Sequence, residues 1–197
     1  PQPPVPLPLD GFAQAAAAGD FDDDGDMDLV FATTPASLVL LAGNGDGTFA
    51  EAQSLALAVS PEVLVPLQWD GQGPLELATL DTNGDAVLRR AEGGVLAQSE
   101  PLATTGELLS LVARDYAGDG LGDLVAQGSA TADVYVGGVG SDVEPDFALP
   151  GPVHGPRQLW AARTASQPTE GLLGLTPLDG WVLVELWDSG TTNPQLY

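Results

Sequence analysis

The chain has 197 residues and a formal net charge of −23, because 28 acidic residues stand against five basic ones, all of them arginine. Such a surface repels phosphate backbones and anionic lipid headgroups, so we expect no binding to nucleic acid or to a membrane surface. The absence of Cys excludes disulfides and thiolate metal sites, and no apolar run approaches the roughly 18 residues of a membrane span.

An apolar run over Phe12–Ala18 leads into the acidic stretch Asp20–Asp28, in which six of nine residues are Asp. These carboxylates repel one another, and a hard divalent cation would supply the counter-charge. Ca²⁺ accepts 6–8 oxygen ligands, which alternate residues of a tight loop can provide. The candidate ligands are the side chains of Asp20, Asp22, Asp24 and Asp28 and a backbone carbonyl near Asp26. Gly25 stands at the sharp turn, where φ > 0 is often needed. The alternative is a solvated acidic turn.

An EF-hand begins with the same D-x-D-x-D-G pattern, but two features argue against one. Its twelfth loop position would be Phe31 rather than a bidentate Glu. The residues that follow the loop, Asp28–Ala32, form a short apolar run that is typical of a buried strand rather than a helix.

The remainder of the chain repeats this organisation. The residue after each loop is a leucine, and Leu29, Leu77, Leu124 and Leu172 follow one another at steps of 48, 47 and 48 residues. Each unit contains short apolar runs separated by Gly, Asn, Asp or Pro. In the first unit they are Phe12–Ala18, Asp28–Ala32, Leu38–Leu41 and a weaker run near Phe49. Four short strands in about 48 residues match one blade of a β-propeller.

We therefore predict an all-β fold, a β-propeller of four four-stranded blades in a single domain over residues 1–197. The blades are expected at about 12–57, 58–104, 105–152 and 153–197. The last unit ends where its outer strand should begin, so we expect the proline-rich residues 1–11 to supply that strand. Residues 1–11 have no signal-peptide features. The ring can close within one chain or between two chains that form an eight-bladed ring.

The motifs Gly19–Leu29 and Gly45–Phe49 resemble the FG-GAP/VCBS repeats of the integrin α-subunit propeller and of related secreted proteins. The resemblance implies a Ca²⁺ site in the first blade. It assigns side-chain ligation to Asp20, Asp22, Asp24 and Asp28 and carbonyl ligation to Asp26. Propellers of this family usually close with seven blades, whereas this chain holds four. The alternatives are a compact four-bladed ring, half of an eight-bladed homodimer and a piece of a longer array.

The other units depart from the motif. The third retains Asp115, Asp119 and Asp123, with Ala117 in place of a ligand, and is the candidate for a second, weaker metal site. The second unit retains only Asp70 and Glu76, so we expect no metal there. In the fourth unit Arg163 stands where the first has Asp20.

Aromatic residues recur at one position of the repeat, as Phe21, Trp69 and Tyr116. Aromatic side chains on propeller loops can stack on sugars, but recurrence at one structural position favours packing between blades.

These observations predict a non-enzymatic, Ca²⁺-binding propeller, secreted or at the cell surface, that acts as a protein-interaction or adhesion module. A lectin-like carbohydrate binder is one alternative. A purely structural domain that assembles with itself, as a homodimer closed through the ring, is the other. No nucleophile, phosphate-binding or dinucleotide motif is present in the sequence.

Overall fold

The structure is a computed structural model. It describes residues 6–9, 11–50, 53–92, 95–104, 106–115, 117–129, 131–138, 143–150, 158–163, 170–178, 181–187 and 195–196. Their strands form four antiparallel four-stranded sheets, each a simple up-and-down arrangement in chain order. This part of the chain contains no helix long and apolar enough to cross a membrane.

The strands of the first two sheets are β1 Phe12–Gly19, β2 Asp28–Thr34, β3 Ser37–Leu41, β4 Gln53–Ala56, β5 Pro61–Leu67, β6 Glu76–Asp81, β7 Ala86–Glu92 and β8 Val95–Pro101. Those of the last two sheets are β9 Leu108–Arg114, β10 Asp123–Gly128, β11 Thr131–Tyr135, β12 Phe147–Pro150, β13 Gln158–Arg163, β14 Glu170–Leu178, β15 Trp181–Trp187 and β16 Gln195–Leu196. The predicted all-β class is confirmed.

One predicted strand of the first unit lies elsewhere. The sequence placed the fourth run near Phe49, but Phe49 forms only an isolated bridge to Gly43, and β4 begins at Gln53. The turn at Gly45–Gly47, with positive φ at both glycines, folds the chain back before the ladder with β3 starts.

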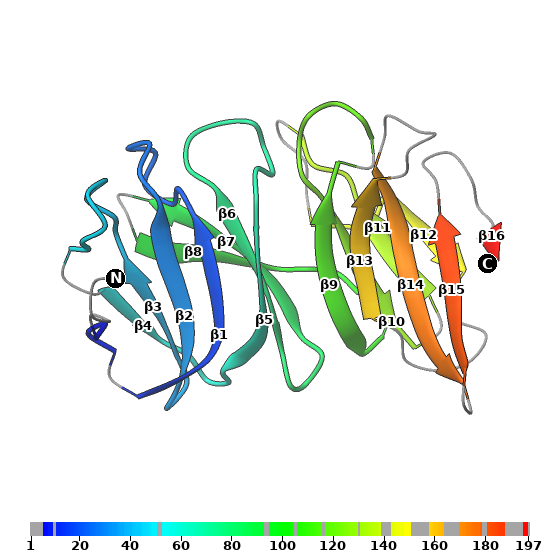
Figure 1. Cartoon of the computed structure of the whole chain (residues 1–197), viewed down its shortest axis with the longest axis horizontal. Helices are drawn as coiled ribbons and strands as arrows, with labels where there is room; N and C mark the ends of the chain where they lie inside the picture. Colours follow the sequence, from blue (N-terminus) through cyan, green and yellow to red (C-terminus); the bar gives the residue numbers. More distant parts are fainter. Residues whose placement is uncertain are drawn as a thin grey trace.

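The sheets lie side by side in chain order, and their innermost strands make the contacts. Strand β1 packs on β5, β5 on β9, and β9 on β13. The first and last sheets are at opposite ends of the long axis of the molecule (Figure 1). The four sheets thus form an open arc in this chain, rather than a ring closed within it.

The expectation for the N-terminal residues does not match this arrangement. Strand β16 pairs with β15 and is the fourth strand of the last sheet, although it is short. Residues 6–9 lie at the other end of the arc, beside the first sheet (Figure 1). Within one chain, therefore, residues 6–9 do not complete the last sheet, whereas residues 1–5 and 10 lie outside the described residues. Sequence order alone could not show this, because closure depends on how far each sheet turns relative to the one before.

Alternation along the strands gives each sheet two apolar faces. We call the face toward the following sheet the forward face and the opposite one the rear face. The forward face of the first sheet carries Ala15, Ala17, Val30, Ala32, Leu38 and Leu40, which pack with rear-face residues of the second sheet such as Leu64 and Leu77. The forward face of the second sheet (Val63, Val65, Ala78, Leu80, Ala86, Leu88) packs in the same way on Leu111, Leu124, Ala126 and Tyr135 of the third.

Candidate metal centre

The acidic stretch forms the loop that joins β1 to β2. Its backbone winds around the side chain of Asp20, whose two carboxylate oxygens accept the N–H groups of Asp23 (2.7 Å) and Gly25 (3.0 Å). Asp23 and Gly25 both have positive φ, 64° and 88°. The positive φ expected at Gly25 is therefore confirmed. The loop is built from side-chain-to-backbone hydrogen bonds of the kind that Asp residues make in turns.

Three carboxylates of this loop converge. Asp20, Asp22 and Asp28 each offer an oxygen atom, and these three atoms lie within 4.8 Å of one another. Oxygen ligands about 2.4 Å from a Ca²⁺ ion lie up to about 5 Å apart, so this spacing fits a hard cation. Partial burial and the charges of Asp28, Asp24 and Asp20 raise the pKa of Asp22, which is the electrostatic cost a cation would offset.

The carboxylate of Asp24 does not join this group, and Asp26 is expected to bind through its backbone carbonyl. Asp24 is exposed, and its carboxylate accepts the N–H of Asp26 at 2.8 Å. The carboxylate of Asp26 points toward the neighbouring turn, where a side chain added at Gly45 would come within 2.6 Å of it. The described residues thus bring together three of the four carboxylates that the repeat motif implies.

Asp28 has a structural role that the sequence did not indicate. It is fully buried and accepts the N–H groups of Phe21 (2.7 Å) and Gly43 (2.8 Å), so it ties the loop to the turn after β3. In the third sheet Asp123 does the same with Ala117 (2.8 Å) and Gly137 (2.9 Å). An acidic residue directly before the repeated leucine was visible in three units as Asp28-Leu29, Glu76-Leu77 and Asp123-Leu124.

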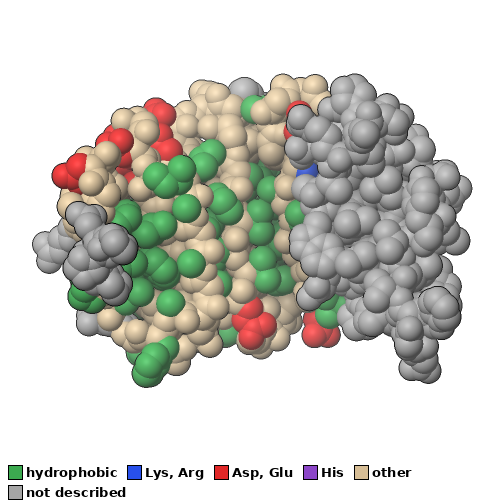
Figure 2. All heavy atoms as spheres, in the orientation of Figure 1, with side chains coloured by type: hydrophobic (Ala, Val, Ile, Leu, Met, Phe, Trp, Pro, Cys, Tyr) green, Lys and Arg blue, Asp and Glu red, His purple; other side chains and the backbone are tan. Residues whose placement is uncertain are grey.

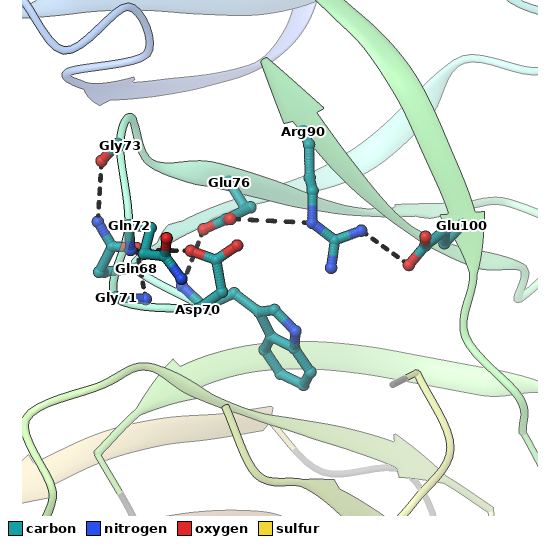
Figure 3. Close-up of polar contacts among 9 residues, drawn as sticks. Gln68, Asp70, Gly71, Gln72, Gly73, Glu76, Arg90 and Glu100 are labelled. Atoms are coloured by element: carbon teal, nitrogen blue, oxygen red, sulfur yellow. Dashed lines mark hydrogen bonds and ion pairs between the residues drawn. The ribbon is translucent and has the colours of Figure 1, made fainter. Parts of the chain in front are cut away.

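The second loop keeps the backbone shape of the first and replaces its charge (Figure 3). Gln68 occupies the position of Asp20; its amide oxygen accepts the N–H of Gly71 and its amide nitrogen donates to the carbonyl of Gly73, both at 3.1 Å. Both glycines have positive φ, 75° and 64°, as Asp23 and Gly25 do. In this loop an uncharged amide, which both donates and accepts hydrogen bonds, therefore takes the place of the carboxylate of Asp20.

Glu76 anchors the second loop as Asp28 anchors the first. Its carboxylate accepts the N–H of Trp69 at 2.8 Å and lies 4.0 Å from Arg90, which also pairs with Glu100 at 2.8 Å (Figure 3). Burial, with the nearby charge of Asp70, raises the pKa of Glu76 despite these partners.

In the third loop Asp115 takes the place of Asp20. It accepts three backbone N–H groups, from Gly118 at 2.6 Å and from Asp119 and Gly120 at 3.0 Å. Among the residues described, Asp115, Asp119 and Asp123 are not brought together as the carboxylates of the first loop are. A buried arginine, Arg114, stands in register opposite Asp123, whereas the first sheet has Gly19 at that position.

In the fourth sheet the ladder continues to Arg163, which pairs in register with Glu170. Strand pairing thus extends over the position where Asp20 begins the first loop. The connecting residues 164–169 lie outside the part of the chain that the structure describes.

The aromatic position of the repeat is a packing position in two of the three loops. Phe21 is 0% exposed between the first and second sheets, and Trp69 is 1% exposed between the second and third. Tyr116 lies outside the described residues. Packing between blades is therefore confirmed for Phe21 and Trp69.

A groove runs between the first loop and the turn after β3. Its lining includes Asp20, Asp26, Met27, Leu29 and Phe49. Met27 is 62% exposed, which is unusual for a large apolar side chain beside an acidic loop. Apolar and acidic groups are thus accessible together at this end of the first sheet.

Comparison with known proteins agrees with this geometry. Residues 20–88, which span the first loop to the third strand of the second sheet, match the model of the FG-GAP-like repeat. This segment is similar to the FG-GAP-like repeat. The predicted resemblance to FG-GAP repeats is thus confirmed for residues 20–88, which include the acidic loop and the second loop at Gln68–Glu76. Among curated proteins none matches the chain in sequence.

Two solved structures have a similar fold. Both are of BBS1N in complex with ARL6DN, one soaked with mercury (TM-score 0.67, 16% identity) and one soaked with lead (TM-score 0.59, 14% identity). Each alignment covers 95% of this chain but only 55% and 58% of the respective solved chain. This chain therefore spans little more than half the length of these structures, and the likeness concerns the propeller-like fold alone.

Proposed function

We propose that this chain is a non-enzymatic β-propeller module of the FG-GAP type, secreted or at the cell surface, that binds a protein partner. In this proposal its first blade is held by Ca²⁺. The observation that supports the metal site is the convergence of Asp20, Asp22 and Asp28 to within 4.8 Å in a loop with a raised Asp22 pKa. Bound Ca²⁺ would neutralise these carboxylates and join the end of β1 to the start of β2.

Thermal unfolding tests the metal site. Addition of EDTA lowers the melting temperature and Ca²⁺ restores it, because a cation that binds only the folded chain adds its binding free energy to stability. Asp22→Asn removes a charge with little change of shape and abolishes the Ca²⁺-dependent shift. Asp46→Asn, in the exposed turn after β3, is the matched control and keeps it. A melting temperature that ignores both EDTA and Ca²⁺ would remove the metal from the proposal.

Protein binding has separate support. The groove beside the first loop presents the exposed Met27 together with the carboxylates of Asp20 and Asp26. An exposed apolar side chain bordered by charges is a common feature of interaction sites. The similar solved structures were obtained in complex with another protein, ARL6DN. We infer a partner segment that combines basic and apolar side chains.

The partner site is tested by quantitative affinity capture with the wild-type chain and two variants. Met27→Glu should release specific partners, whereas Leu109→Glu, at a similarly exposed apolar residue of β9, should not. Equal recovery by the wild type and Met27→Glu would exclude this groove. The lectin alternative is weakened because Phe21 and Trp69, two of the three aromatic residues that could stack on sugar, are buried.

A further inference from the structure

Among the described residues, no sheet packs on the rear face of the first sheet. Ala16, Phe31 and Val39 lie in register across it, as do Ala18, Leu29 and Leu41. Val39 and Leu41 are buried, but Leu29 and Phe31 are only half-buried, and Ala16 and Ala18 are exposed. The open part is therefore the half formed by β1 and β2. Figure 2 shows hydrophobic side chains gathered there, with acidic side chains along the rim.

The same face is covered in the next two sheets. Leu77 and Leu124 occupy the repeat position of Leu29, and both are 0% exposed because each packs on the forward face of the preceding sheet. The molecule thus contains two completed examples of the contact that the first sheet leaves incomplete. In both examples the innermost strands make most of the contact, and the open half of the first sheet includes its innermost strand, β1.

The first sheet is also nearly free of charge. Strands β1, β3 and β4 contain no charged residue, and in β2 the only one is Asp28, which is buried and hydrogen-bonded to backbone N–H groups. The second sheet carries acidic or basic residues on every strand. Depletion of charge is the compositional mark of the centre of an interface, and here it occurs in a chain with 28 acidic residues.

The other end of the chain supplies a matching sheet. In the last sheet, the register positions that correspond to the forward face of the first are occupied by Trp160, Leu173 and Leu186 in one row and by Gln158, Leu175 and Val184 in the next. In the first sheet the corresponding rows are Ala17, Val30, Leu40 and Ala15, Ala32, Leu38. The last sheet therefore has mainly apolar residues at the positions that, in earlier sheets, meet the rear face of the following sheet.

We propose that the rear face of the first sheet binds the forward face of the last sheet of a second copy of this chain, so that two chains close one ring of eight sheets. Closed propellers contain about four to eight blades, so eight is within the known range. Both junctions of such a dimer are the same head-to-tail contact, and the assembly is finite because the rotation between the two copies closes the ring.

Light scattering after gel filtration tests the assembly. The wild-type chain should have twice the 20.1 kDa mass of one copy. Ala16→Glu should reduce the mass to one copy, because it places a charge on the exposed part of the rear face. Ala117→Glu, at an exposed alanine in the loop of the third sheet, adds the same charge away from the first sheet and should remain dimeric. A wild-type monomer at all concentrations, a mass that grows beyond two copies, or a dimer that survives Ala16→Glu would each overturn the proposal.

Cross-linking tests which faces meet, and the absence of Cys from the chain makes the labelling unambiguous. A chain with both Ala16→Cys and Gln158→Cys should give covalent dimers with a short bis-maleimide, whereas either substitution alone should not. Dimers from Ala16→Cys alone would mean that two first sheets meet face to face, which contradicts the ring. Neither experiment involves Ca²⁺ or the Met27 groove, so its failure is distinct from a failure of the proposed function.

Discussion

Substitution of the repeated leucine by alanine measures how much the contact between sheets contributes to the free energy of unfolding. Leu124 is 0% exposed between the second and third sheets, so Leu124→Ala leaves a cavity in a packed layer. Such a change costs about 2–5 kcal/mol, and we expect about 3 kcal/mol here. For a chain of this size the corresponding fall in melting temperature is about 6–12 °C. Leu29 occupies the same repeat position, but its face is open, so Leu29→Ala should cost only about 1 kcal/mol.

Both substitutions should be measured in the Ala16→Glu background, which keeps the rear face of the first sheet open whether or not the wild type dimerises. Urea unfolding followed by tryptophan fluorescence is suitable, since Trp69 is buried in the layer that contains Leu124. Equal losses for Leu29→Ala and Leu124→Ala in that background would refute the reasoning, because they would show that the first sheet already buries its rear face as fully as the third does.

Three further substitutions have defined outcomes. Glu76→Gln should flatten the pH dependence of stability. Because the pKa of Glu76 is raised in the folded chain, the folded chain binds this proton more tightly than the unfolded chain does. The stability of the wild type therefore falls as pH rises from the ordinary Glu range through the folded pKa. Urea unfolding from pH 4 to 7 should show the variant gaining on the wild type as pH rises, and parallel curves would contradict this. Asp23→Gly should stabilise the chain by about 0.5 kcal/mol in thermal unfolding, because Asp23 has φ 64° where the other two loops have Gly. Its control, Asp24→Gly, should destabilise the chain, because it loses the 2.8 Å hydrogen bond from the N–H of Asp26. Tyr135→Phe should cost about 1 kcal/mol in the same assay, since it leaves the carbonyl of Ala103 without the 2.7 Å hydrogen bond it now accepts; no loss would mean that water replaces the phenol.

Much of the fold was predictable because its units are local. Each strand of a sheet pairs with its neighbour in sequence, so the apolar runs and the turns between them determine the pairing. The step of 48, 47 and 48 residues between the leucines indicated four such units. The Phe21 and Trp69 positions could be assigned to packing from their recurrence alone, and the structure buries both.

The features that could not be predicted depend on the orientation of side chains and on the rotation between sheets. The motif spacing treated the carboxylates of Asp20, Asp22, Asp24 and Asp28 alike, yet only three of them converge among the described residues, because that of Asp24 accepts a nearby N–H. The opening of the arc follows from small rotations between sheets, which no residue pattern records. The anchoring role of Asp28 was missed because an acidic residue in an acidic loop was assigned to the metal. Its recurrence as Glu76 in the second loop, where no metal was expected, was the signal that could have separated the two roles.

The loops also show which part of their shape would depend on a cation. In all three described loops, the side chain at the first position accepts at least one N–H of the turn; these residues are Asp20, Gln68 and Asp115. The acidic residue before the repeated leucine accepts the N–H of the residue at or next to the aromatic position; these residues are Asp28, Glu76 and Asp123. Hydrogen bonds of the same kind therefore shape the backbone of each loop, including the second, where an amide replaces the first carboxylate. Only the first loop then concentrates three carboxylates within 4.8 Å. Because charge distinguishes the first loop from its copies and shape does not, removing Ca²⁺ should weaken the junction of β1 and β2 while the second and third sheets keep their packing. Hydrogen exchange would show this as faster exchange at Phe21 and Gly43 with unchanged protection at Trp69 and Gly137. A uniform loss of protection across all four amides would mean that the cation supports the whole arc.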